Sequence, residues 1–254
     1  MMIKETLQGG LIYLTMALFL AAAALLRGKF RAAGRNLWFM GFAAAVASVV
    51  WRGLHTGHPP MQNLFEFFLC MAAFLWPLSL LSRRQSGADT DFQDALLGFI
   101  ILFPAGFVFG EEVRRLPPAL QSPLFIPHVG SYVAGYVMLA RAALLALPLF
   151  RADADDARVR QADAASRQTA AVGFVLLTLG LLLGSLWGKI CWGRYWQWDP
   201  KEMWSLATWF AYGAYFHYRL KSGLRRPRAL AVLLWIGLLF VVLTLTWINV
   251  SRHF

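Results

Sequence analysis

The chain has 254 residues, of which 59% are hydrophobic and 15% are charged. This composition excludes an ordinary soluble domain, because the apolar residues are gathered into long runs. The formal charge of +11 at pH 7 would suit a nucleic-acid-binding protein. Most lysines and arginines, however, lie in short connections between apolar runs, where they orient membrane helices, so no nucleic-acid partner is expected.

The apolar runs predict the fold. A helix of about 20 apolar residues crosses the roughly 30 Å hydrocarbon core of a bilayer, and unpaired backbone groups are too costly there. We therefore expect an all-α, polytopic transmembrane helical bundle that forms one integral membrane domain over residues 1–254. The polar, Ala-rich residues 151–168 are expected to form a surface helix or a flexible loop. The eight predicted spans are, in chain order, about 11–26, 37–51, 64–81, 95–110, 129–150, 170–186, 200–218 and 229–247.

The connections between these spans carry unequal positive charge. Those after the first, third, fifth and seventh spans hold fifteen lysines and arginines, whereas the termini and the remaining connections hold eight. By the positive-inside rule the first set is cytoplasmic, so both termini are expected on the external side. The connection before the seventh span, together with His58, His128 and His253, is then external as well.

Residues 187–209 contain six of the eleven tryptophans. Within them, Asp199, Pro200 and Glu202 form a helix-start signal: a capping carboxylate, a proline suited to the first helical position, and an acidic residue three positions after the cap. The sequence therefore predicts that the seventh span begins at Pro200.

The tryptophans of this stretch allow two interpretations. They can belong to an interfacial aromatic belt, because amphipathic rings gather at the head-group level of a bilayer. They can also form a platform for a flat, apolar ligand that carries anionic groups. In that case Lys189, Arg194 or Lys201 could bind its carboxylates.

Histidines near the ends of the spans suggest metal chemistry. His128 and His253 each lie at an external end, where two neutral imidazoles could bind iron from opposite sides of a flat macrocycle. Each could equally be an ordinary interfacial residue. His217 lies 17 residues after Pro200, or about 26 Å along the helix. That depth suggests a second site near the cytoplasmic side.

Three further polar residues are weaker candidates. Arg141 falls inside a predicted span, so it must face the bundle or a polar cavity, where a ligand carboxylate could pair with it. Otherwise the span boundary is misplaced and the side chain snorkels. Glu66, near His58, could pair with a cation or cap a helix.

The chain contains no CxxCH sequence and is therefore not itself a c-type cytochrome.

Four segments carry a family resemblance. WGRYWQWDPKEMWSL, residues 192–206, resembles the tryptophan-rich WWD motif of cytochrome c assembly proteins, and its DPKE ending is similar to the CcsA/ResC branch, System II. GHPPMQNLFEFF (57–68), SPLFIPHVGSYVAGY (122–136) and NVSRH (249–253) resemble further segments of that branch. Phe65 and Phe67 depart from the pattern, because the family often has Tyr and Ser there.

The resemblance implies a haem-handling and haem-export subunit in a bacterial cytoplasmic membrane, with the WWD segment (about 187–204) on the periplasmic side. It implies a CcsB/ResB-type membrane partner, haem b as the ligand that is handed on, and the CxxCH segment of apocytochrome c as its acceptor. Thiol-reducing proteins would act indirectly. Holocytochrome c synthase (haem lyase) activity would belong to the complex, with no certain catalytic residue in this chain.

The resemblance also implies residue roles. His128 and His253 correspond to the external axial haem ligands, and His217 corresponds to an inner membrane haem site shared with the partner. The haem-contacting surface would be formed by Trp192, Gly193, Arg194, Tyr195, Trp196, Trp198, Asp199, Lys201 and Glu202.

Two other functions remain open: a HemX-like regulatory membrane protein, and an unrelated membrane transporter whose tryptophans form only an interfacial belt.

Overall fold

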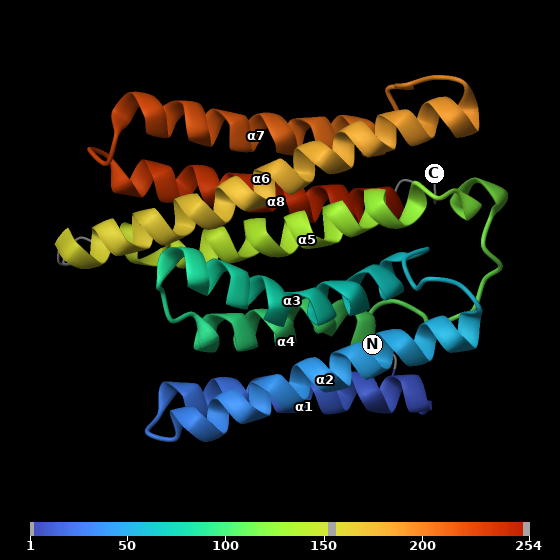
Figure 1. Ribbon diagram of the computed structural model, residues 1–254, viewed down its shortest axis with the longest axis horizontal. Coiled ribbons are helices and arrows are strands. Elements are labelled where there is room, and N and C mark those ends of the chain that lie inside the picture. Colours follow the sequence, from blue (N-terminus) through green and yellow to red (C-terminus); the bar gives the residue numbers. More distant parts are fainter. Residues whose placement is uncertain (1–2, 152–155, 251–254) are drawn as a thin grey trace. The chain divides into compact units, whose positions relative to one another are not determined.

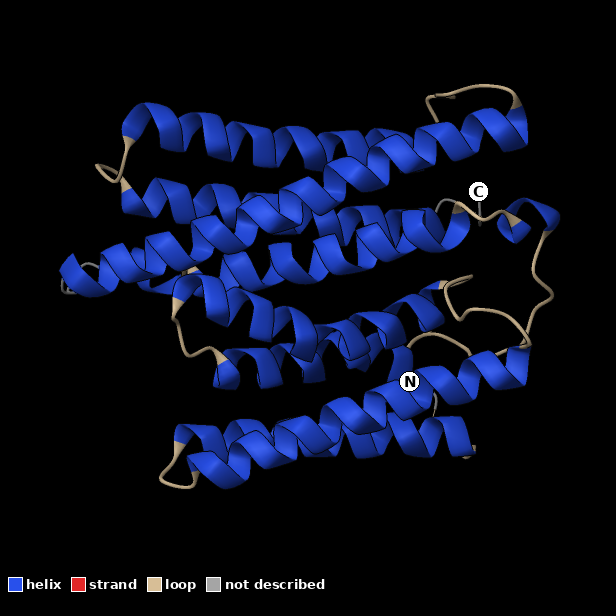
Figure 2. Cartoon of the chain, in the orientation of Figure 1, coloured by secondary structure: helices blue, strands red, loops and turns tan. Residues whose placement is uncertain are grey.

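A computed structural model describes residues 3–151 and 156–250. Across these residues all regular structure is helical (Figure 2), which confirms the predicted all-α class. Eight α-helices and two short 3-10 helices follow one another along the described chain. They are α1 (Leu7–Arg27), α2 (Arg31–Thr56), α3 (Leu64–Ser86), α4 (Asp91–Phe107), η1 (Pro118–Gln121), α5 (Phe125–Leu145), η2 (Leu147–Phe150), α6 (Asp156–Trp192), α7 (Pro200–Ser222) and α8 (Pro227–Val250).

Six of the helices in the described ranges are long and apolar enough to cross a membrane: α1, α2, α3, α5 with η2, α6 and α8. The chain is therefore a polytopic integral membrane protein. Helix α4 has 17 residues and two aspartates in its first turn. Helix α7 is long enough, but many of its residues are tyrosine, serine, threonine or charged, which lowers its mean hydropathy.

Helix α6 departs most from the prediction. Residues 156–168 form its first turns, and the helix continues without a break for 37 residues to Trp192. At 1.5 Å per residue it is about 56 Å long, nearly twice the thickness of the hydrocarbon core. Alanine, arginine and glutamine favour helix, which explains why the polar segment continues the span. One helix thus joins this segment to the Trp-rich stretch.

The helices form two compact units, each with its own core. Unit 1 comprises residues 1–83 and 89–122, and so contains α1, α2, α4 and nearly all of α3. Unit 2 comprises residues 84–88 and 123–254, and contains α5 to α8. Figure 1 shows the helices of each unit running side by side along their lengths. The single assembly domain expected from the sequence stays a prediction.

A buried ion pair organises one end of unit 1. The guanidinium of Arg52 donates from Nε to Glu66 Oε1 at 3.0 Å, and both side chains are at most 3% exposed. Its other nitrogens donate to the carbonyl oxygens of Glu111 at 2.7 Å and Glu112 at 3.1 Å. One arginine therefore ties α2 to the start of α3 and to the segment that follows α4.

Polar contacts hold α7 inside unit 2. The hydroxyl groups of Thr208 and Thr244 lie 3.1 Å apart between α7 and α8. Near the far end of α7, Arg219 makes two hydrogen bonds to the Asp163 carboxylate of α6, at 3.0 and 2.6 Å. The polar face of α7 is thus turned toward neighbouring helices. Its buried side chains all carry a hydroxyl group: Ser205, Thr208, Tyr212 and Tyr215.

Candidate functional site

The Trp-rich stretch begins on α6 and turns away at Gly193. Helix α6 ends at Trp192, and Gly193 has a φ of +78°, a left-handed conformation that glycine adopts without strain. The Lys189 ammonium donates to the Gly193 carbonyl at 3.0 Å and lies 5.5 Å from the centroid of the Tyr195 ring. Lys189 and Gly193 therefore shape the turn that presents Tyr195.

The stretch ends at the helix start that the sequence predicted. Asp199 is the N-cap of α7, its carboxylate accepts from the Glu202 backbone N–H at 2.9 Å, and Pro200 is the first helical residue. The Glu202 carboxylate accepts from the backbone N–H of Gln197 at 2.7 Å, two residues before the cap. Both carboxylates are engaged with backbone donors, so they fix the loop where it enters α7.

Three large aromatic side chains of the Trp-rich stretch are exposed. Trp192, Tyr195 and Trp198 are 53, 58 and 68% exposed, and we call them the aromatic surface. Trp196 is half-buried and meets Trp198 edge-on, with ring centroids 6.1 Å apart. Trp198 has a φ of +60°, which is strained for a bulky residue. Such strain persists where the surrounding structure imposes it, and it gathers at functional sites.

His128 lies at the start of α5 and is held against α6. Its Nδ1 is 2.9 Å from the carbonyl oxygen of Gly180. Because a carbonyl can only accept, the proton of a neutral imidazole must reside on Nδ1, and Nε2 keeps its lone pair. A hydrogen bond of this kind from the second nitrogen is usual for metal-binding histidines. In a neutral His128, Nε2 is therefore the ring nitrogen that could bind a metal ion.

Aromatic rings connect His128 with Trp192, the first residue of the aromatic surface. The centroid of the His128 imidazole lies 5.4 Å from the ring centroid of Trp187 and 5.2 Å from that of Tyr132. Trp187 in turn meets Trp192 edge-on, with centroids 5.0 Å apart. The His128 imidazole thus belongs to one aromatic cluster with Tyr132, Trp187 and Trp192, at the end of unit 2 where α5 begins and α6 ends (Figure 1).

Glycine residues of α6 make this position of His128 possible. A Cβ atom at Gly184 would lie 2.6 Å from His128 Cε1 and 3.0 Å from Nδ1. A Cβ at Gly180 would lie 2.9 Å from ring atoms of Tyr132. Small residues let membrane helices approach closely, and here the approach leaves room for the two rings of α5.

The remaining candidates of unit 2 are placed as follows. Arg194 and Lys201 are exposed; in the sequence, Arg194 directly precedes Tyr195 and Lys201 follows Trp198 by three positions. His217 is exposed on α7, far along the helix from Pro200. Arg141 is buried, 1% exposed, so it faces the interior of the unit rather than snorkelling. His253 lies outside the described residues.

Two candidates belong to unit 1. The ring nitrogens of His58 lie 3.0 Å from the Pro59 carbonyl oxygen and 3.4 Å from that of Arg114, so the ring links two loop segments. Glu66 is paired with Arg52 and accepts from the Gln62 backbone N–H at 2.8 Å. Pairing with a cation was one of the two roles considered for Glu66, and the ion pair confirms it.

Comparison with known proteins shows which family the chain belongs to. A family model described as "Cytochrome C assembly protein" matches residues 61–253. The chain belongs to the cytochrome c assembly protein family. The "Cytochrome c biogenesis protein CcsA" of Parasynechococcus marenigrum (strain WH8102) is 31% identical over 245 residues, which cover 81% of this chain and 78% of the relative. CcsA of Synechococcus sp. (strain WH7803) is 29% identical over 275 residues, which cover 89% of this chain and 85% of the relative. CcsA of Chlamydomonas reinhardtii is 31% identical over 218 residues, which cover 78% of this chain and 61% of the relative.

Membership of the cytochrome c assembly protein family confirms the resemblance seen in the sequence and assigns the chain a role in cytochrome c maturation. The matched residues include His128, the aromatic surface and all of α5 to α7. They exclude α1 and α2, and the aromatic cluster lies wholly within the matched residues.

Sequence reasoning missed the residues that position His128. Gly180 supplies the carbonyl acceptor, Gly184 supplies space, and Trp187 supplies the ring against which the imidazole lies. One signal was available: Gly173, Gly180 and Gly184 are separated by seven and four residues, so they share one face of a helix. A row of small residues on one face predicts a close helix partner in a membrane.

Proposed function

We propose that this chain is the haem-handling subunit of a System II-type cytochrome c synthetase and that it presents haem b, its cargo, on the aromatic surface. The observation that carries the proposal is the hydrogen bond from His128 Nδ1 to the Gly180 carbonyl. It leaves Nε2 as an iron ligand within the same aromatic cluster as Trp187 and Trp192.

The chemistry of the cluster fits haem. Exposed indole and phenol rings suit the flat, apolar face of a porphyrin, and stacking of such rings is favourable. The exposed cations Arg194 and Lys201 belong to the same stretch of sequence and suit the propionates, since charge-assisted hydrogen bonds are the stronger ones. His253 would supply the second axial ligand. Asp199 and Glu202 would act by holding the loop, because backbone N–H groups engage both carboxylates.

His217 supports a second, inner site shared with a membrane partner. Its side chain is exposed on α7, about 26 Å along the helix from Pro200. An ionisable side chain turned away from its own unit within a membrane is costly, so it suggests a partner or ligand there. A CcsB/ResB-type subunit would supply the other ligand of this site.

The reaction we propose for the complex is thioether formation with apocytochrome c. Each thiol of a CxxCH segment adds across a haem vinyl group: sulfur bonds to one carbon and hydrogen to the other, so no atom is lost. The iron and both thiols must be reduced, which is how thiol-reducing proteins would contribute. This chain would supply orientation and electrostatics.

An absorption spectrum of the purified complex tests the external ligand. We expect His128→Gly, and separately His253→Gly, to lose low-spin haem, and added imidazole to restore it by filling the space of the missing ring. His55→Gly is the matched control, because His55 is an exposed histidine that stacks on Trp51 in unit 1. Low-spin spectra that are unchanged in both variants would rule out this site and favour a transporter with an aromatic belt.

Orientation has its own test. We propose that both termini and the aromatic surface face the periplasmic side of a bacterial cytoplasmic membrane, as the charge asymmetry between connections indicates. A C-terminal tag should then be reachable by protease in spheroplasts and protected in inverted vesicles. The opposite pattern would reverse the model and place the aromatic surface in the cytoplasm.

A further inference from the structure

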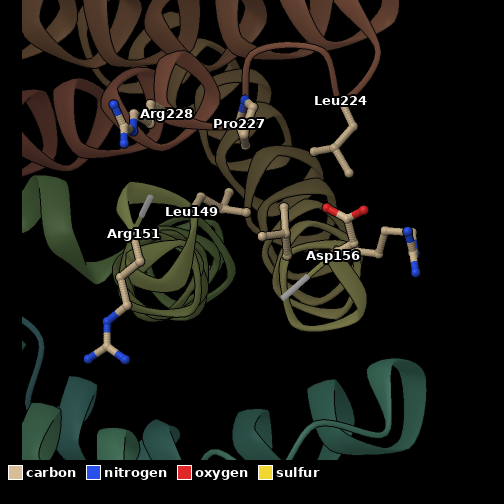
Figure 3. A pocket seen from close by; sticks show the side chains of 8 residues that line it. Leu149, Arg151, Asp156, Leu224, Pro227 and Arg228 are labelled. Carbon is tan, nitrogen blue, oxygen red and sulfur yellow. The ribbon is translucent and has the colours of Figure 1, made fainter. Parts of the chain in front are cut away.

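The two ends of unit 2 are packed differently. A cavity of about 440 Å³ lies at one end, where η2, the start of α6 and the connection from α7 to α8 meet (Figure 3). At the other end, the ring of Tyr132 occupies the space between α5 and α6 next to His128. It meets the imidazole edge-on with centroids 5.2 Å apart, and two of its atoms lie 2.9 Å from the position that a Cβ of Gly180 would take. Tyr132 therefore packs against both His128 and α6.

The hydroxyl group of Tyr132 extends this contact to α7. Ser205, which is buried on α7, makes side-chain hydrogen bonds with Tyr132 and with Tyr136, one turn further along α5. The rings of the two tyrosines meet at an interplanar angle of 62°, with centroids 5.4 Å apart. Hydroxyl groups that bond across helices fix one helix relative to another inside a membrane. One serine of α7 is thus tied to the turns of α5 that follow His128.

Ser205 belongs to the part of α7 that anchors the Trp-rich stretch. It follows Glu202 by three positions, so the two side chains are neighbours on the helix surface. The Glu202 carboxylate accepts from the backbone N–H of Gln197 at 2.7 Å, and its negative charge acts on the Tyr132 hydroxyl. Gln197 directly precedes Trp198. Tyr132 therefore reaches the α7 end of the Trp-rich stretch.

We propose that Tyr132 is a positioning residue, whose hydroxyl contact with Ser205 sets the position of the His128 imidazole relative to the α7 end of the Trp-rich stretch. This role rests on the proposed function, because an iron porphyrin would have to reach His128 Nε2 and the exposed ring of Trp198 at once. Ligating groups work when neighbouring side chains hold them to within about 0.5 Å. The Gly180 carbonyl fixes the orientation of the imidazole, whereas Tyr132 fixes its separation from the Trp-rich stretch.

Haem titration of the purified complex, followed by the low-spin absorption band, tests this role in a double-mutant cycle. Tyr132→Phe keeps the ring against His128 and removes only the hydroxyl group, and Ser205→Ala removes the partner of that group. Each variant should bind haem about fivefold more weakly, and the double variant should lose no more than Ser205→Ala alone, because one shared contact is removed. The g values of ferric low-spin haem, which report the orientation of an axial imidazole, should shift in Tyr132→Phe. A hydroxyl group with a purely structural role would leave them unchanged.

Tyr212→Phe is the matched control. It removes the same atom from a fully buried tyrosine of α7, about 10 Å along the helix from Ser205, whose hydroxyl has no hydrogen-bond partner among the described residues. This variant should bind haem within about twofold of the parent and keep its g values. Three results would overturn the role of Tyr132: an affinity of Tyr132→Phe within twofold of the parent, equal losses in Tyr132→Phe and the control, or a loss of about 25-fold in the double variant.

A haem-free measurement separates this role from the proposed function. A parent complex without a low-spin band would refute the proposed haem site, and the contact of Tyr132 with Ser205 would then be judged in the protein alone. Hydrogen exchange at the Gln197 amide should be about fivefold faster in haem-free Tyr132→Phe than in haem-free Tyr212→Phe. Equal rates would show that Tyr132 does not hold the α7 end of the Trp-rich stretch, and would overturn its positioning role whatever the haem titration gives.

Discussion

Replacing one glycine of α6 should disable the proposed haem site without removing any proposed ligand. In Gly184→Ala the new Cβ would lie 2.6 Å from His128 Cε1. Ordinary contacts begin near 3.4 Å, so the imidazole must move by about 0.8 Å. The His128 ring has little room to move, because its Nδ1 is hydrogen-bonded to the Gly180 carbonyl and the rings of Trp187 and Tyr132 lie against it.

The displacement can be expressed as a loss of haem binding. A shift of about 0.8 Å away from α6 lengthens the Nδ1–Gly180 hydrogen bond from 2.9 Å to about 3.7 Å, beyond hydrogen-bonding range. Loss of the hydrogen bond that orients a metal-binding histidine usually costs about 10- to 100-fold in metal affinity. Alanine favours helix over glycine by about 0.8–1.0 kcal/mol, so α6 itself should remain helical.

The assay is haem titration of the complex, followed by the low-spin absorption band. Gly184→Ala should bind haem about 10- to 100-fold more weakly than the parent. Gly130→Ala is the control, because a Cβ there meets nothing within 4 Å although it lies two residues from His128 on α5. An unchanged affinity in Gly184→Ala would refute the reasoning that the Gly180 hydrogen bond orients an iron ligand. Equal weakening in both variants would refute it too.

Two further predictions concern the framework. Arg52→Met should destabilise the protein by about 3–5 kcal/mol, because Glu66, 1% exposed, would keep a buried charge without its cation. Adding Glu66→Gln should recover part of the loss in denaturant unfolding, and additive losses would contradict the pairing. Asp199→Ala should weaken the start of α7 by about 1 kcal/mol, whereas Asp199→Asn keeps an acceptor for the Glu202 N–H. Hydrogen exchange in the first turn should be faster in the alanine variant only, and equal rates would contradict the capping role.

Much of the fold could be predicted from the sequence because its signals are local. Apolar runs of membrane-spanning length predicted the helices, and Asp199 with Pro200 predicted the start of α7 to the residue. The continuity of α6 was harder to predict, because residues 156–168 are polar, and polarity alone does not separate a helix that projects from the membrane from a loop. The buried face of α7 was hard to predict for a different reason, because its polar residues suggest an exposed surface. Its buried serine, threonine and two tyrosines lower the hydropathy of a helix whose hydroxyl-bearing side chains lie inside unit 2.

The sequence by itself determined which residues could bind: a tryptophan-rich stretch, cations beside it and a histidine on each of several segments. Only the tertiary structure decided which nitrogen of His128 is available. That choice depends on the Gly180 carbonyl, 52 residues away in the chain, and on an α5–α6 approach close enough for a ring to lie against Gly184. No local pattern around His128 encodes this hydrogen bond. It arises because glycines on one face of α6 remove the side chains that would otherwise keep the two helices apart.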